Sequence, residues 1–505
     1  MSSLRKLAGE TVIYGLSTVA GRFLNFLLVP FYTRVFQPDE YGVVTELYAY
    51  ITFLLVVYTY GMETAFFRFA SKETEPANTF STAFYSLLGS SLIFSTALYF
   101  SADSIAALLN YQEQAWLLRW TALILFFDTV AIIPFAWLRY NKKALKFSLV
   151  KLGHVLFNIS FNVLFLMVFP WLVGIYGTEI FSSFVYSEEI GPGYVFIANF
   201  LASALILVFL TREFSTIRPA FDYELWKKMV AFSMPLVVVG LAGMINEVSD
   251  RIMLRHLLPY EEELRMHYLG IYGACYKLSI FMTLGIQAFR YAAEPFFFQK
   301  ARDADAPETY ASLMNYFIAA GGLVFLSISL FLEPIKFVID EAYHEGIHIV
   351  PILLLANLFL GIYYNTAVWY KLTNKTGAGA AIASTGAIIT ISGNFLLIPW
   401  IGYIGAAITT LICYVFMCIA SWQWGKNYYP IPYDLKAISF ILLTSVSILM
   451  AAEGFIYYQE PALVIAYLLR IAGLGIFLVC LSWLFNVKMA DLKKAFRQVI
   501  SKKKS

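Results

Sequence analysis

Charged residues are scarce in this sequence, and several kinds of functional motif are missing. Asp, Glu, Lys and Arg together make up 14% of the chain, against about 25% in a soluble domain. The net charge is only +3, so bulk charge gives no reason to expect a nucleic-acid partner. There is no GxxxxGK[ST] nucleotide-binding loop and no Ser/His/Asp cluster. The sequence therefore predicts neither an enzyme nor a nucleotide-driven pump.

Cysteine is rare as well. The four cysteines, Cys275, Cys413, Cys418 and Cys480, all lie in apolar runs, and none belongs to a CxxC pair. This pattern is typical of reduced packing residues and not of a disulfide framework or a metal site. No metal and no cofactor are expected.

Long apolar runs dominate the sequence. Hydrophobic residues make up 60% of the chain, and its mean hydropathy is +0.69. Because a helix needs about 20 mostly apolar residues to cross a bilayer, the runs predict an all-α integral membrane protein with about fourteen transmembrane helices. The predicted spans are 11–33, 43–65, 80–100, 115–138, 148–169, 194–211, 229–254, 268–290, 312–333, 350–370, 379–399, 404–423, 437–457 and 463–486.

The basic residues predict the orientation of these spans. Most of the 36 lysines and arginines fall on the side of the amino terminus, whereas Arg34, Arg255, Arg265 and Lys336 fall on the opposite side. Positive charge is concentrated in cytoplasmic loops, so both termini of this multi-pass protein are expected in the cytoplasm. The basic tail 487–505 is expected to form a short helix on the anionic inner leaflet, with a solvated tail as the alternative.

A weak internal repeat relates the second predicted span to the eighth. Gly42 aligns with Gly270, and Tyr48 aligns with Tyr276. Transporters are often built from such repeats, with the substrate path between them. The repeat therefore predicts two pseudo-symmetric six-helix bundles followed by two further helices. The predicted parts are an N-terminal bundle (1–215), a C-terminal bundle (216–430), two additional transmembrane helices (431–486) and the tail (487–505).

Arg22 lies in the middle of the first predicted span. On a helix it shares one face with Asn25 and with several small and hydroxylated residues. A guanidinium in hydrocarbon costs roughly 3 kcal/mol on insertion scales, so it needs a wet cavity or a partner. We expect a water-filled cavity that accepts an anion; the alternative is an ion pair with a carboxylate on a neighbouring helix.

The eighth span carries the longest polar stripe. Tyr276, Gln287 and Arg290 belong to a series with helical spacing, and Lys277 lies one step beside it. These four residues join Arg22 and Asn25 as candidates for lining a substrate cavity. The alternative for Lys277 is a side chain that reaches to the membrane interface.

Six further ionisable residues are candidates for ion coupling or for gating. Asp128 lies deep in its span and needs a partner or a cavity, and His154 either carries a coupling proton or packs as a neutral side chain. Glu247 and Arg251 are four residues apart and are expected to pair on one helix, either as a structural lock or as a gate. The six candidates are Glu46, Asp128, His154, Glu247, Asp250 and Arg251.

Several short motifs resemble a known family. They are Arg22 followed by Pro-Asp-Glu-Tyr-Gly (38–42), Phe-Ser-Met-Pro-Leu (232–236), Ser-Asp-Arg (249–251) and Leu-Gly-Ile-Tyr (269–272). In order and spacing they resemble the bacterial polysaccharide transporters, the oligosaccharide flippases of the multidrug/oligosaccharidyl-lipid/polysaccharide (MOP) exporter superfamily. The acidic loop 259–267 is longer than this resemblance leads us to expect.

The resemblance implies a function. Such proteins move an undecaprenyl-pyrophosphate-linked oligosaccharide across the bacterial inner membrane for O-antigen, capsule or exopolysaccharide synthesis. They work by alternating access through a cationic central cavity, and Arg22 matches the family's basic position in the first span. The implied partners are the lipid-linked oligosaccharide, membrane lipids, a coupling cation (H⁺ or Na⁺), a polysaccharide polymerase and glycosyltransferases, with no nucleic acid.

Three other functions stay open at this point. A lipid II-type flippase fits the same features. A cation-coupled multidrug exporter would need deep acidic residues, which Asp128 and Glu46 supply, although Arg22 argues against it. A scaffold of polysaccharide assembly that transports nothing would tolerate the loss of the charge at Arg22.

Overall fold

The protein is an all-α membrane protein, as predicted. The computed structural model describes residues 2–71, 75–109, 111, 114–177, 186–301 and 303–485, with only the backbone for residues 2–13, 295 and 299. Within these ranges the chain forms helices and turns and contains no strand. The predicted basic tail 487–505 lies outside the described residues.

The first part of the chain forms helices that match the first six predicted spans. They are α1 (Ser2–Phe26), α2 (Leu28–Val35), α3 (Pro38–Thr59), α4 (Met62–Ala70), α5 (Pro76–Phe100), α6 (Ala102–Leu108), α7 (Ala115–Tyr140), α8 (Ala144–Val163), η2 (Leu164–Val168), α9 (Phe169–Tyr176), η4 (Glu188–Ile190), α10 (Gly193–Phe209) and α11 (Thr211–Phe214).

The second part of the chain forms helices that match the remaining eight predicted spans. Its helices are α12 (Tyr223–Leu257), α13 (Glu262–Leu278), α14 (Ile280–Lys300), α15 (Ala306–Leu330), α16 (Leu332–Ile335), η5 (Lys336–Val338), η6 (Glu341–Ile349), α17 (Val350–Thr366), α18 (Val368–Leu372), α19 (Thr376–Ile401), α20 (Tyr403–Tyr428), α21 (Leu435–Gln459) and α22 (Leu463–Leu484).

Length and hydropathy identify fewer membrane-crossing helices than the fourteen predicted spans. In the described ranges, 11 helices are long and apolar enough to cross a bilayer, or 12 when the bent pair α13–α14 counts as one span. The apolar helix α10 is shorter, with 17 residues. A helix lies over each of the fourteen predicted ranges, but the number fourteen itself stays a prediction.

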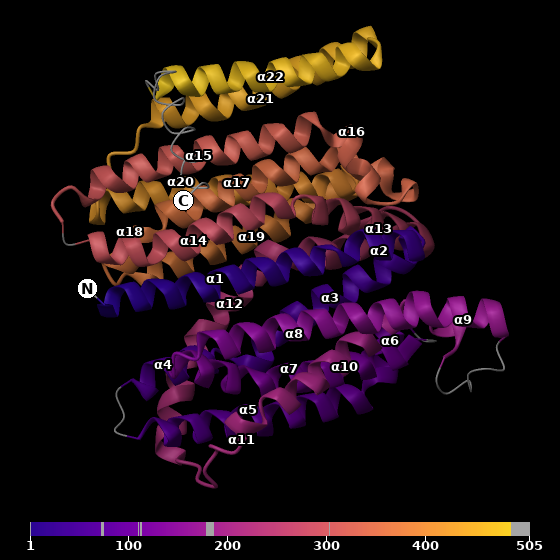
Figure 1. The fold of residues 1–505 in the computed structure, drawn as a ribbon, viewed down its shortest axis with the longest axis vertical. Coiled ribbons are helices and arrows are strands. Elements are labelled where there is room, and N and C mark those ends of the chain that lie inside the picture. The colour runs from indigo at the N-terminus through magenta and orange to yellow at the C-terminus, as the bar shows by residue number, and fades with distance from the viewer. Residues whose placement is uncertain are drawn as a thin grey trace, which may run out of the picture.

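The helices gather in two groups (Figure 1). Helices α4 to α10 form one group, α13 to α20 form the other, and the pair α21 and α22 lies at the far side of the second group against α15. Three helices link the groups in the described part of the chain. Helix α1 packs against α8 and α14, α3 packs against α7 and α13, and α12 packs against α4, α19 and α20. The division at 215, 430 and 486 remains a prediction.

The eighth predicted span is not one straight helix. It breaks at Ser279 into α13 and α14, which meet at an angle of 45°. The polar stripe expected along a single helical face is therefore interrupted, and residues beyond the break point in a direction that the 3.6-residue period does not predict.

Helices α3 and α13 cross at the two glycines of the internal repeat. A Cβ atom on Gly270 would lie 1.7 Å from the carbonyl oxygen of Pro38, and one on Gly42 would lie 2.2 Å from that of Met266. Only hydrogen fits at such a distance, so the two backbones touch directly. The repeat thus places its matched glycines opposite each other, where the two groups of helices make their closest contact.

Candidate functional site

A cavity of about 520 Å³ opens between the two groups of helices. Its walls come from α1, α3, α7, α8 and α10 on one side and from α12, α13 and α14 on the other. Its main polar and charged lining residues are Arg22, Asn25, Thr45, Tyr48, Thr52, Asp128, His154, Asn158, Asn199, Glu247, Arg251, Tyr276, Lys277, Ser279 and Thr283.

Two cations in this cavity have no anionic partner among the residues that the structure describes. The side chains of Arg22 on α1 and Lys277 on α13 are exposed to the cavity. Among the described residues, neither one forms an ion pair within 4.0 Å or a side-chain hydrogen bond. The expected alternative, in which a carboxylate on a neighbouring helix neutralises Arg22, therefore has no support in the described part of the chain. A cation at membrane depth is costly without water or a bound anion, so each of the two side chains requires one or the other.

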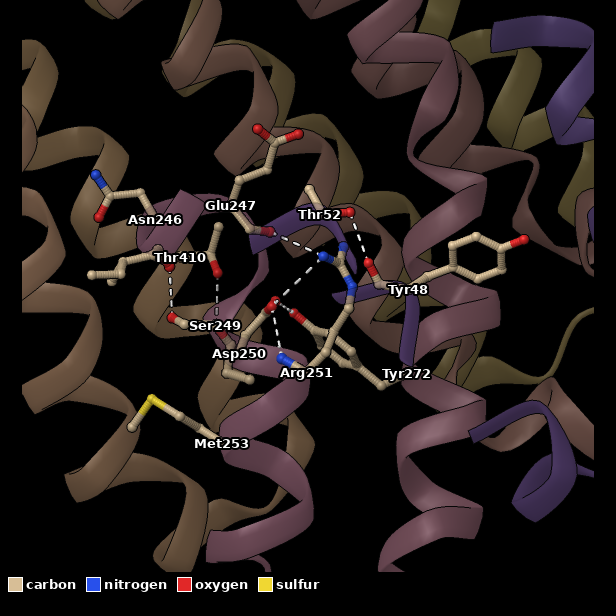
Figure 2. A network of polar contacts seen from close by, with 12 residues as sticks. Tyr48, Thr52, Asn246, Glu247, Ser249, Asp250, Arg251, Met253, Tyr272 and Thr410 are labelled. Carbon is tan, nitrogen blue, oxygen red and sulfur yellow. Dashed lines mark hydrogen bonds and ion pairs between the residues drawn. The ribbon is translucent and has the colours of Figure 1, made fainter. Parts of the chain in front are cut away.

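Arg251 also faces the cavity, but it is held by its own helix and by α13 (Figure 2). Its guanidinium lies 3.9 Å from Oδ1 of Asp250, donates a hydrogen bond of 3.1 Å to the backbone carbonyl of Glu247, and stacks 4.1 Å above the ring of Tyr276. The expected ion pair between Arg251 and the Glu247 carboxylate is wrong in this structure. Residues four apart are within reach, but the neighbouring Asp250 takes the guanidinium.

Asp250 is fixed by two further hydrogen bonds. Its Oδ2 atom accepts from the Tyr272 hydroxyl at 2.5 Å, and its Oδ1 atom accepts from the backbone N–H of Arg251 at 2.8 Å. Glu247, by contrast, points its carboxylate away from this cluster (Figure 2), and it lies on the cavity wall. Asp250 is therefore held in place by these hydrogen bonds. The Glu247 carboxylate forms no hydrogen bond or ion pair among the described residues and is accessible to a bound ligand.

We predict that Tyr272→Phe destabilises the protein. The substitution leaves Oδ2 of the buried Asp250 without its donor, which costs about 1–3 kcal/mol. The measurement is the unfolding temperature of the detergent-solubilised protein. Tyr268→Phe is the control, because the Tyr268 hydroxyl has no side-chain hydrogen bond among the described residues. Equal unfolding temperatures for the two variants would contradict the role given to Tyr272.

A second polar cluster lies on the opposite wall. The Ser203 hydroxyl on α10 donates to Oδ1 of Asp128 on α7 at 2.6 Å and lies 3.1 Å from Nε2 of His154 on α8. Asn199, one turn before Ser203, donates to the Tyr48 hydroxyl at 2.9 Å. Asp128 thus has the partner and the cavity that its depth requires. Ser203 and Asn199 gave no signal in the sequence, because isolated polar residues are common in apolar helices.

Four of the predicted residues are not among the lining residues of this cavity: Gln287, Arg290, Glu46 and Asp250. Gln287 and Arg290 follow the break at Ser279. Arg290 stacks 4.1 Å above the ring of Tyr364 and lines a small separate pocket. Glu46 is fully buried and bonded to Arg255 at 2.6 Å. Arg255 directly follows the predicted span 229–254 and is expected on the outer side, and its burial against Glu46 is not predicted from the sequence.

The described residues contain no group of three or more His, Cys, Asp or Glu side chains placed to hold a metal ion. Proton-binding and hydrogen-bonding groups are what the cavity offers. Its arrangement is suited to binding a polar, anionic molecule at the level of the membrane.

The fold is similar to that of solved structures of membrane proteins. Over 93% of this chain and 99% of the other, the structure is similar to that of the lipid II flippase MurJ in an inward closed conformation, with a TM-score of 0.65 and 16% sequence identity. An inward-facing multidrug resistance MATE family transporter of the MOP superfamily matches over 80% of this chain and 94% of its own, with a TM-score of 0.61 and 12% identity. At these identities the likeness establishes the fold. No curated protein matches the chain in sequence.

A family model described as "Polysaccharide biosynthesis protein" matches residues 31–310, which is more than half of the chain. The match includes α3, α7, α8, α10, α12 and α13, and thus most of the cavity wall. The two similar structures named above are those of a flippase and a multidrug transporter. The chain belongs to the polysaccharide biosynthesis protein family and has the fold of the MOP superfamily of membrane transporters.

Proposed function

We propose that this protein flips a lipid-linked oligosaccharide, carried on undecaprenyl pyrophosphate, from the cytoplasmic to the outer leaflet of a bacterial inner membrane. The observation that carries the proposal is the pair of unpaired cations, Arg22 and Lys277, on the wall of a cavity between two groups of helices. A diphosphate needs cations, and a guanidinium engages phosphate oxygens in a bidentate way. The lipid tail remains in the bilayer while the head group crosses through the cavity.

Uncharged polar groups along the cavity wall suit the sugar part of such a substrate. Asn25, Asn158 and Asn199 supply amides, and Tyr48 and Thr52 supply hydroxyls. These groups donate and accept hydrogen bonds without adding charge, as a chain of sugar hydroxyls requires. The cations then hold the diphosphate while the amides and hydroxyls hold the sugars.

Energy for directed transport requires a coupling step, since the sequence contains no nucleotide-binding loop. The cluster of Asp128, Ser203 and His154 is the proposed place for a coupling proton, because its hydrogen bonds join two titratable groups through one hydroxyl. Glu247 is the other candidate, as a free carboxylate on the cavity wall. Sodium stays the alternative coupling ion.

A cation-coupled drug exporter is the second candidate function. The observation that favours it is that Asp128 and Glu247, two carboxylates, line the same cavity as the cations. A lipid II-type flippase would use the same cations on a different diphosphate lipid. A scaffold of polysaccharide assembly would need none of these groups.

The deciding experiment follows the lipid-linked oligosaccharide in a strain that lacks the gene. We expect the undecaprenyl-linked repeat to accumulate at the cytoplasmic face, and the wild-type gene to clear it. Normal surface polysaccharide with no accumulated intermediate would contradict the flippase. Accumulation of lipid II would support the lipid II branch, and a change only in drug efflux would support the exporter.

The proposal also includes the partner proteins, the membrane in which the protein lies and the side on which its termini lie. A flippase of this kind works beside a polysaccharide polymerase and glycosyltransferases, and we place it as a multi-pass protein in the inner membrane with both termini in the cytoplasm. Reporter fusions at the two ends measure the orientation, and a reporter active on the outer side would contradict it.

A further inference from the structure

An ionic cluster with a buried centre and one partly exposed member, Glu262, lies at the end of the molecule away from the amino terminus. It consists of Glu46 on α3, Tyr111 before α7, Arg255 near the end of α12, and Glu262 at the start of α13. Figure 1 shows α2, α6 and the beginning of α13 at this end, opposite the amino terminus. In the predicted orientation this is the outer side of the membrane.

Arg255 is the centre of the cluster. Its side chain donates to Oε2 of Glu46 at 2.6 Å and to Oε1 of Glu262 at 2.8 Å from Nε and 2.5 Å from the terminal nitrogen. The Tyr111 hydroxyl also donates to Oε2 of Glu46, at 2.5 Å, and the guanidinium lies 4.0 Å above the Tyr111 ring. The exposed fraction is 2% for Arg255 and 0% for Glu46. Water is therefore excluded from the pair.

The cluster joins the two groups of helices. Glu46 and Tyr111 come from the first part of the chain, and Arg255 comes from α12, a helix of the second part. Of the ion pairs formed by the described residues, Arg255–Glu46 is the one with both side chains buried that connects residues before 215 with residues after it. Burial and the adjacent carboxylate of Glu46 raise the pKa of Tyr111 well above its ordinary value, so its hydroxyl keeps its proton and remains a donor.

The backbone contact between α3 and α13 lies beside this cluster. Glu46 is one helical turn after Gly42 on α3, and Gly42 meets Gly270 at the crossing of the two helices. Arg251 on the cavity wall is one turn before Arg255 on α12. The cavity reaches Tyr41, slightly more than one turn before Glu46 on α3. The cluster therefore lies beside the outer part of the cavity, where α3 and α12 would have to separate to open an outward path.

We infer that the Glu46–Arg255 pair is the lock that keeps the outer end of the cavity closed. In the closed state the two charges neutralise each other in a dry interface, and in an outward-open state both become hydrated. Removal of Glu46 leaves the buried Arg255 with Glu262, whose side chain is 42% exposed, as its remaining carboxylate partner, and removal of Arg255 leaves the Glu46 charge buried without a cation. Either change disfavours the closed state and not the open one. Transport by alternating access is part of the proposed function, so the lock rests on that proposal.

The test measures how fast the cavity is reached from outside. The reporter is Thr283→Cys, a cavity-lining position, in a chain whose four native cysteines are replaced by alanine. A membrane-impermeant maleimide is added to the outside of intact cells, and the rate of labelling is measured. We expect Glu46→Gln to raise this rate at least tenfold.

A matched control separates the lock from a general effect of a lost charge pair. Arg119→Gln breaks the ion pair of 2.6 Å between Arg119 and Asp103, which lies within the first group of helices, and we expect it to change labelling less than twofold. The double variant Glu46→Arg with Arg255→Glu restores opposite charges and should return labelling toward the slow rate.

Two results would overturn the lock. One is unchanged labelling in a Glu46→Gln protein that is made and inserted at the normal level. The other is equally fast labelling in the control Arg119→Gln. Should Glu46→Gln fail to insert, the charge-exchanged double variant decides: slow labelling supports the lock, and failure of both versions to assemble contradicts it. The assay needs no substrate, so its failure is distinguishable from failure of the flippase.

Discussion

Arg22→Ala is expected to weaken binding of a diphosphate-linked oligosaccharide by roughly 10- to 150-fold. A hydrogen bond to a charged group contributes about 1.5–3 kcal/mol, and each 1.4 kcal/mol is about a tenfold change in Kd. Arg22 has no other anion to neutralise in the described structure, so its interaction is available to the ligand. The measurement is the Kd of the purified protein for a short-chain polyprenyl diphosphate that carries the oligosaccharide.

Two further variants sharpen this prediction. Arg22→Lys should show an intermediate loss, because an ammonium keeps the charge without the bidentate geometry. Lys151→Ala is the matched control, since Lys151 is an exposed cation on α8 that is not among the cavity residues. Equal affinities for wild type and Arg22→Ala, or an equal loss in Lys151→Ala, would remove Arg22 from the binding site.

Gly270→Val is expected to abolish the close crossing of α3 and α13. Its Cβ would lie 1.7 Å from a backbone oxygen that cannot rotate away, so the helices must separate. Overpacking of this kind costs roughly 1–3 kcal/mol or more. We expect a lower unfolding temperature together with faster outside labelling of the cavity, because the displaced contact lies at the outer end.

The control for this substitution lies in the next helix. Gly285 on α14 has no atom within 4 Å of a Cβ built on it, and Gly285→Val should leave the unfolding temperature nearly unchanged. If Gly270→Val is as stable as wild type and labels at the same slow rate, the crossing has no role in closing the outer end.

Helical periodicity correctly predicts several residues of the cavity wall. The predictions that are wrong have a physical cause. Arg22 and Asn25 were assigned to one cavity face because an unbroken helix repeats every 3.6 residues, and both lie on the cavity wall. Gln287 and Arg290 were assigned by the same period across Ser279, where the helix breaks, and both lie off that wall. Nothing in the sequence around Ser279 indicates a bend of 45°.

Contacts between distant helices were harder to anticipate. The pairing of Glu46 with Arg255 joins residues 209 positions apart, and positional spacing within one helix contains no information about it. Arg255 looked like a loop charge, because it follows the apolar part of its span. The sequence repeat did relate Gly42 to Gly270, but it gave no reason to expect that the two glycines touch.

The most direct test of the proposed function is lipid flipping by the purified protein in proteoliposomes. The probe is a fluorescent oligosaccharide on a polyprenyl diphosphate, placed in both leaflets, and dithionite added outside destroys only the probe that reaches the outer leaflet. We predict that nearly all fluorescence is lost with the wild-type protein, and that about half survives with Arg22→Ala, as in protein-free vesicles. Equal survival with wild type and in protein-free vesicles, across an imposed proton or sodium gradient of either direction, would contradict the flippase.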